Sequence, residues 1–159
     1  MRRKFLFFIV LLIISLTVAG NVNLRDLTAN EWREDIAFLE RTLVKQHPDA
    51  FNKVSQEEFT RAFQKLQTDI ENLQWYEIYT SLTALVAMIG DGHTVIYPYT
   101  VLRGFPVYPY SFKDGIYIIA TDENNRELLN TRLVGVNGLD MKELLDVLRP
   151  VVSHDNEWG

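Results

Sequence analysis

Apolar residues recur at helical spacing through the first half of the chain. From Trp32 they follow at steps of four, three and four, and from Phe59 at steps of four, three, four and three. Such a repeat places the apolar side chains on one face of an amphipathic helix. A third repeat ends before Gly90, a residue type typical of helix ends. The pattern predicts three helices, over about 28–47, 55–73 and 75–89.

The first two of these helices begin with the residues of a capping box, in which two side chains satisfy free backbone N–H groups at the helix start. The pairs are Thr28 with Glu31 and Ser55 with Glu58. His47-Pro48 ends the first helix, because proline disfavours the helical conformation in the residue before it. His47 is predicted to cap the last carbonyl groups of that helix. Short links between three helices predict an antiparallel bundle.

The second half has a different residue pattern, with short segments rich in β-branched and aromatic residues. Turn dipeptides, Asp114-Gly115 and Asn137-Gly138, separate some of these segments. Prolines at 98, 106 and 109 confine their segments to sheet edges or irregular stretches. The predicted strands are 94–97, 105–112, 116–121 and 132–136.

A last helix is predicted over 140–148, with leucines on one face and Pro150 beyond it. The fold class predicted from these elements is α+β. Three helices form an N-terminal bundle, and a small β-sheet with one helix follows.

The first twenty residues have the layout of a secretory signal peptide. Arg2, Arg3 and Lys4 form a basic start, 5–14 is an unbroken apolar run, and small residues follow up to Gly20. The apolar stretch is shorter than the roughly 20 residues that a membrane-spanning helix needs. We therefore expect an exported protein that is secreted, periplasmic or displayed on the cell surface. The alternative is a chain anchored in the membrane by an uncleaved leader.

Charge and cysteine content exclude several classes of function. The whole chain has a net charge of −5, and outside the leader thirteen basic residues face twenty-one acidic ones. A nucleic-acid binder would need a basic surface, so nucleic acid is not an expected partner. Cysteine is absent, which excludes disulfides, thiolate nucleophiles and cysteine-ligated metals.

The chemistry is concentrated in the segment Gly90-Asp91-Gly92-His93-Thr94, between a predicted helix and a predicted strand. Two glycines around an aspartate allow a tight turn that projects the next side chain. That side chain is His93, and an imidazole suits general acid–base work near neutral pH. The alternative is a helix cap whose histidine only hydrogen-bonds a neighbour.

Other candidate sites are weaker. Ser153-His154-Asp155 has the residue types of a catalytic triad, but adjacent side chains point in different directions and cannot converge. Asp91 and His93 with a distant His47 or His154 lack the spacing of metal ligands, so no metal is predicted. No serine lies in a strand–turn–helix elbow between glycines, and no phosphate-binding loop is present.

An ordered series of sequence blocks runs from Glu31 to Glu157. In order, the blocks are Trp32-x-x-Asp35-Ile36-x-x-Leu39, His47-Pro48 with Phe51, Ile89 to Thr94, Phe105-Pro106, Asp114 to Tyr117, Leu133 to Gly138, and Ser153-x-Asp155-Asn156-Glu157. This series resembles the N-terminal part of the C-terminal-processing/tricorn-core family of serine peptidases.

The resemblance implies a role for each part of the chain. It makes His93 the general base, with Gly90, Asp91, Gly92 and Thr94 as supporting residues of its turn. It makes 105–148 a PDZ-like module. The nucleophilic serine and orienting glutamate of that family have no counterpart in these 159 residues. The predicted organisation is a signal peptide at 1–20, a helical region at 21–92, and an incomplete part at 93–159 with the first core strand and the PDZ-like module.

The function expected from this resemblance is that of the N-terminal portion of a secreted serine peptidase, inactive on its own. Its partner would be a peptide or protein substrate, it would need no cofactor, and only an uncleaved leader would bring it to a membrane. A non-catalytic PDZ-like module that binds peptides is the alternative. A structural protein whose helices pack on a partner is the third class.

Overall fold

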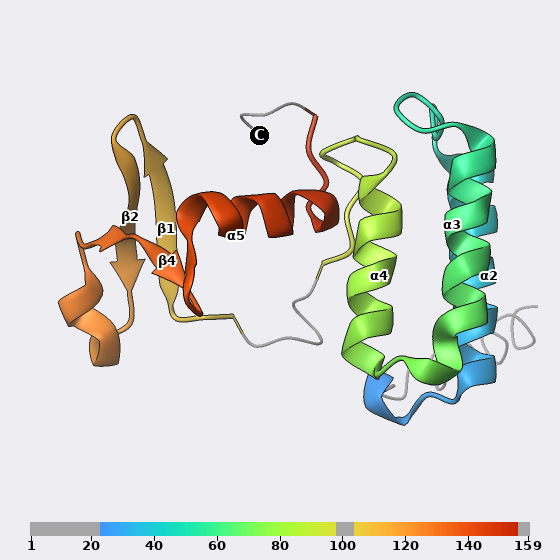
Figure 1. The fold of residues 1–159 in the computed structure, drawn as a ribbon, viewed down its shortest axis with the longest axis horizontal. Coiled ribbons are helices and arrows are strands. Elements are labelled where there is room, and N and C mark those ends of the chain that lie inside the picture. Colours follow the sequence, from blue (N-terminus) through green and yellow to red (C-terminus); the bar gives the residue numbers. More distant parts are fainter. Residues whose placement is uncertain (1–22, 98–103, 156–159) are drawn as a thin grey trace, which may run out of the picture.

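The computed structural model describes residues 23–97 and 104–155. A helical bundle is followed by a small antiparallel sheet and one further helix (Figure 1), which confirms the predicted α+β class. The signal peptide predicted at 1–20 lies outside the described residues.

The bundle consists of the three predicted helices. These are α2 (Ala29–Gln46), α3 (Gln56–Asp69) and α4 (Trp75–Ala87), with short 3-10 turns η1 (Leu24–Asp26) before α2 and η2 (Ile70–Asn72) after α3. Both predicted capping boxes are present: Glu31 N–H donates to Thr28 Oγ1 at 3.3 Å, and Glu58 N–H donates to Ser55 Oγ at 3.2 Å. The start of each helix is therefore set locally, as the sequence predicts.

One hydrophobic core holds the three helices together, and their apolar stripes form it. Phe59 and Phe63 of α3 are completely buried at its centre. The Phe59 ring lies 4.8 Å from that of Phe63 and 5.8 Å, edge to face, from that of Phe51. The other buried members are Trp32, Ile36, Leu66, Ile70, Ile78, Leu82, Leu85 and Ile89.

The sheet contains β1 (Val107–Phe112), β2 (Gly115–Thr121) and β3 (Arg132–Leu133), in the order β1-β2-β3 and antiparallel throughout. Phe112 pairs with Gly115 at the end of the β1–β2 hairpin. Pro109 lies on the edge strand β1, where the register shifts, as expected of a residue that has no N–H to donate.

Two of the predicted strands are wrong. The segment 132–136 is not one strand, because the chain changes partner at Val134: β3 pairs with β2, whereas β4 (Gly135–Val136) pairs with β5 (Leu139–Asp140). The turn between β4 and β5 is Asn137-Gly138, with φ of 53° and 84°. The segment 94–97 forms no strand, and its Ile96 packs against the helical core instead of joining a sheet.

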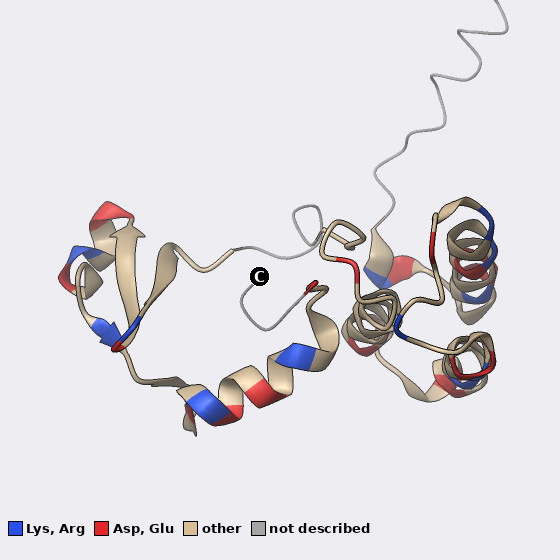
Figure 2. Ribbon diagram, turned by 90° about the horizontal axis from the view of Figure 1, so that it is seen from above, with Lys and Arg blue, Asp and Glu red and all other residues tan. Residues whose placement is uncertain are grey.

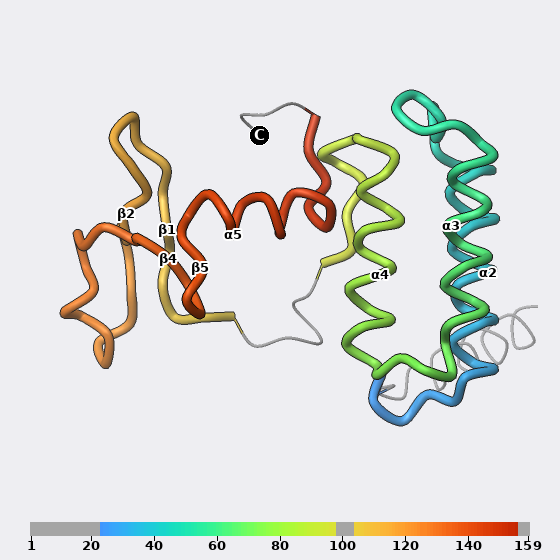
Figure 3. Tube along the Cα trace, in the orientation of Figure 1, coloured from blue at the N-terminus to red at the C-terminus, as the bar shows by residue number. Residues whose placement is uncertain are grey.

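The chain returns to the bundle after the sheet. Helix α5 (Met141–Leu148) begins at its N-cap Asp140, and η5 (Arg149–Val151) then packs against α4. The short helix η4 (Glu123–Leu128), which the apolar pattern does not predict, lies between β2 and β3. Figure 3 shows the segment after α5 running back beside the loop that follows α4. Two segments that are far apart in sequence thus meet at the end of α4.

The two halves of the protein differ in how many hydrophobic side chains they bury. In Figure 2 the sheet and the bundle lie at opposite ends of the molecule, and acidic and basic turns alternate along α5, which connects them. Among the described residues of the second half, Ile118 alone is a buried hydrophobic residue. Large side chains of β1 remain exposed, among them Tyr108, Tyr110 and Phe112. The sheet therefore lacks a core of the kind that stabilises the bundle.

Candidate active site

The segment 90–94 forms a tight turn directly after α4. Gly90 has a φ of +70°, and its N–H donates to the carbonyl of Ala87 at 3.0 Å. A Cβ at this position would press on the side chain of Lys53, and a non-glycine residue would be strained at this positive φ. Glycine thus lets the chain leave the helix here without that strain.

The Asp91 carboxylate organises the turn. Its Oδ1 accepts the backbone N–H of His93 at 2.9 Å, and its Oδ2 accepts the hydroxyl of Thr94 at 2.7 Å. The Thr94 N–H donates to the carbonyl of Asp91 at 3.1 Å. These bonds hold three of the predicted site residues in one arrangement.

His93 projects from this turn into solvent, with 91% of its side chain exposed. Its Nδ1 lies 3.4 Å from Oδ1 of Asp91. A carboxylate at Nδ1 favours the tautomer that carries its proton there, which leaves the Nε2 lone pair free. His93 therefore has the geometry of a general base that is open to a reacting group.

His47 has a different role from the one predicted for it. Its backbone N–H donates to the carbonyl of Leu43 at the end of α2, but its imidazole does not cap the helix carbonyls. The ring Nε2 instead lies 3.0 Å from Oδ2 of Asp91 and 3.0 Å from Oγ1 of Thr94, with only 12% of the side chain exposed. The bundle brings a second histidine to the turn, which spacing along the chain could not indicate.

The returning C-terminal segment holds the turn from the other side. Asp155 Oδ1 accepts the N–H of Gly92 at 2.7 Å, and Ser153 Oγ donates to the carbonyl of Thr94 at 2.7 Å. Lys53 Nζ donates to the backbone carbonyl of Asp155 at 2.7 Å. The contributions of Lys53 and Asp155 could not be predicted from the sequence, because they depend on contacts across 102 and 63 positions.

Residues 153–155 were predicted not to converge as a catalytic triad, and the structure agrees. Ser153 and Asp155 bind separate backbone groups of the turn, while Nδ1 of His154 lies 2.8 Å from the carbonyl of Val152. No serine hydroxyl in the described part of the chain hydrogen-bonds to His93.

The pKa of Asp91 is held well below its ordinary value. The His93 backbone N–H is the main cause, followed by the hydroxyl of Thr94 and the imidazole of His47. All three are hydrogen bonds to the charged form, which they stabilise. Asp91 is therefore ionised at neutral pH and can act as an acceptor for His93.

The lowered pKa of Asp91 predicts a specific acid sensitivity. Since its ordinary value is 3.8, ionised Asp91 stabilises the folded state above about pH 4, and this contribution is lost as the pH falls through the folded-state pKa. Between pH 5 and pH 2 the free energy of unfolding should therefore fall more steeply in the wild type than in Asp91→Asn. Urea denaturation at a series of pH values measures both slopes.

A matched control for this prediction is Asp35→Asn, at an exposed position of α2. This variant should follow the wild-type slope. Equal slopes for the wild type and Asp91→Asn would contradict the role given to the carboxylate.

A cluster of three side chains at this turn has metal-ligand chemistry. One ligand atom each of Asp91, His93 and Asp155 lies within 4.8 Å of the others. Both carboxylates, however, already accept backbone N–H groups of the turn, and His93 and Asp155 are exposed. The hydrogen bonds account for the arrangement, and the absence of a metal stays a prediction.

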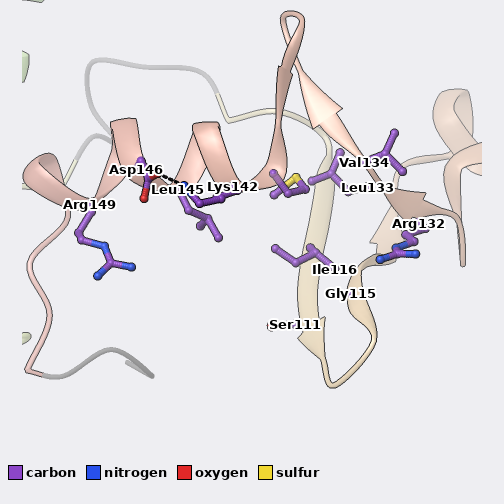
Figure 4. A pocket seen from close by; sticks show the side chains of 11 residues that line it. Ser111, Gly115, Ile116, Arg132, Leu133, Val134, Lys142, Leu145, Asp146 and Arg149 are labelled. Atoms are coloured by element: carbon purple, nitrogen blue, oxygen red, sulfur yellow. Dashed lines mark hydrogen bonds and ion pairs between the residues drawn. The ribbon is translucent and has the colours of Figure 1, made fainter.

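A second concave site lies between the sheet and α5. It is a groove of about 720 Å³, and Figure 4 shows side chains of α5 on one side and of β2 and β3 on the other. Ile116, Leu133 and Leu145 form part of its apolar lining, and Arg132 and Arg149 contribute positive charge. Lys142, also in the lining, pairs with Asp146 at 2.9 Å.

Comparisons with family models, with curated proteins and with solved structures gave no match. None of the helices in 23–97 and 104–155 has the length and hydrophobicity of a membrane span.

Proposed function

We propose that this chain is the N-terminal portion of an exported serine peptidase that resembles the C-terminal-processing/tricorn-core family, with His93 as its general base. The observation that carries the proposal is the pairing of the Asp91 carboxylate with Nδ1 of an exposed His93 on a rigid turn. This is the arrangement that a general base needs. Export would depend on the leader at 1–20, and the partner would be a peptide or protein substrate.

In the proposed reaction the nucleophile is a serine outside these residues. His93 Nε2 takes the hydroxyl proton as the serine oxygen attacks the peptide carbonyl, and then gives a proton to the leaving amine as the C–N bond breaks. Water next attacks the acyl-enzyme, with His93 again accepting and returning the proton. Asp91 stabilises the imidazolium that forms at each step.

The uneven burial of the two halves also supports the proposal. Exposed aromatic side chains on β1, together with the single buried apolar residue among the described positions of the second half, are what a part of a larger core would show. Ser55 caps a helix and Ser153 donates to a backbone carbonyl, and no serine hydroxyl in the described chain hydrogen-bonds to His93. The chain alone is therefore expected to be inactive.

Two measurements test the proposal. The reading frame downstream of Gly159 should encode a serine on a strand–turn–helix and, later, a glutamate. The 159-residue chain should not cleave an unstructured peptide such as casein fragments. Cleavage by this chain alone, at a rate that His93→Ala abolishes, would contradict the assignment of the nucleophile to a later segment.

The groove beside α5 favours a second candidate, a non-catalytic PDZ-like module that binds extended peptides. Because β2 is paired on both sides, an added peptide strand would have to pair with β1 or β3. Titration of labelled C-terminal peptides should then give saturable binding that Leu145→Asp abolishes. The absence of saturable binding would rule out this candidate.

A further inference from the structure

We propose that His47 is a positioning residue for His93 and that it acts through the Asp91 carboxylate. The inference rests on the proposed function, since it gives the helical bundle a task in preparing the general base. His47 is 44 residues from Asp91 in the sequence, and only the folded chain brings the two together.

The two ring nitrogens of His47 have different partners, and these partners define its tautomer. The backbone N–H of Asp49 donates to Nδ1 at 3.1 Å. A nitrogen that accepts a hydrogen bond carries no proton, so the single proton of the neutral ring is on Nε2. That nitrogen is the one that lies 3.0 Å from Asp91 Oδ2.

The Nε2–H group of His47 supports the carboxylate by two routes. It can donate directly to Oδ2 of Asp91, or to Oγ1 of Thr94, which is also 3.0 Å away. The Thr94 hydroxyl in turn donates its own proton to Oδ2. By either route, Oδ2 is held by groups anchored in the bundle and the turn.

This arrangement decides which carboxylate oxygen faces His93. With Oδ2 engaged, the carboxylate cannot rotate freely, and Oδ1 remains toward the backbone N–H and Nδ1 of His93. An acceptor at Nδ1 favours the Nδ1–H tautomer of His93 and leaves Nε2 as the basic nitrogen. His47 thus sets the tautomer of His93 without contacting the substrate.

The position of His47 makes this support rigid. It is the C-cap residue of α2, its side chain is mostly buried, and Pro48 restricts its backbone. The packing of α2 in the core therefore fixes where the Nε2–H group lies. Rigid supporting contacts of this kind hold a catalytic group in its productive orientation.

The test is nitrogen NMR of the 159-residue chain labelled with ¹⁵N-histidine, which contains only three imidazoles. The spectra are recorded in alkaline buffer, because the ¹⁵N shifts of a neutral imidazole report which ring nitrogen carries the proton. In the wild type we expect the Nε2–H form for His47 and a predominant Nδ1–H form for His93. His154→Gln assigns the third imidazole and should leave both tautomers unchanged.

Two substitutions of His47 separate its hydrogen bond from its packing. The amide of His47→Gln can place an N–H near the position of Nε2, whereas His47→Asn is one methylene shorter and falls short of Asp91. We expect His47→Gln to keep most of the Nδ1–H form of His93 and His47→Asn to lose at least half of it. Asp91→Asn should lose it as well.

Each result bears on a different part of the proposal. An Nδ1–H form of His47 in the wild type would overturn the inference without any variant, even if His47→Asn did not fold. The inference would also be overturned if His93 had the same fraction of the Nδ1–H form in His47→Asn as in the wild type. Equal losses of this form in His47→Asn and His47→Gln would overturn it as well. If Asp91→Asn alone changed His93, the proposed general base would stand and only the role of His47 would fail. If no variant, Asp91→Asn included, changed His93, the Asp91–His93 pairing and the proposed function would fail together.

Discussion

His93→Ala, introduced into the protein encoded by the whole reading frame, is expected to lower kcat/KM for peptide hydrolysis at least about a thousandfold. In the proposed reaction the imidazole accepts the serine proton during attack and returns a proton to the leaving amine, and His93→Ala removes both steps. Because 91% of the His93 side chain is exposed, its removal leaves no cavity in the bundle. The loss should therefore be one of catalysis and not of folding.

Steady-state hydrolysis of an unstructured peptide measures this effect, and far-UV circular dichroism checks that the variant is folded. His154→Ala is the matched control, because that imidazole contacts the carbonyl of Val152 and takes no part in the turn hydrogen bonds. It should retain activity within a few-fold of the wild type. A loss of less than tenfold in His93→Ala would show that another group is the base.

Phe59→Ala is expected to lower the free energy of unfolding by about 3–5 kcal/mol. Phe59 is completely buried and contacts the rings of Phe51 and Phe63 at the centre of the bundle. Truncation to alanine removes its buried apolar surface and leaves a cavity that the surrounding side chains fill only in part. The bundle also anchors His47, so this variant should weaken the turn as well.

Urea denaturation followed by circular dichroism measures the change. Phe38→Ala on α2 is the control, since 64% of Phe38 is exposed, and the free energy of unfolding should change by no more than about 0.5 kcal/mol. Similar losses for the two variants would mean that the core is not centred on Phe59.

The helical half could be predicted because its signals are local. The capping boxes at Thr28 and Ser55 lie next to the apolar repeats that they start, and each repeat forms its own buried stripe. The strands were less predictable, since a strand depends on its partner. The segment 132–136 divides between two partners at Val134, and 94–97 packs on the helices and pairs with no strand of the described chain.

The candidate site also has a part set by local interactions and a part set by the tertiary structure. The sequence by itself determined the turn. Asp91 accepts hydrogen bonds from His93 and Thr94, two and three positions further on, and the positive φ at position 90 favours glycine. Only the tertiary structure decided that His47 and Asp155 complete it. Their hydrogen bonds join segments 44 and 63 residues apart, which meet because the core of the bundle and the return of the chain after α5 place them there.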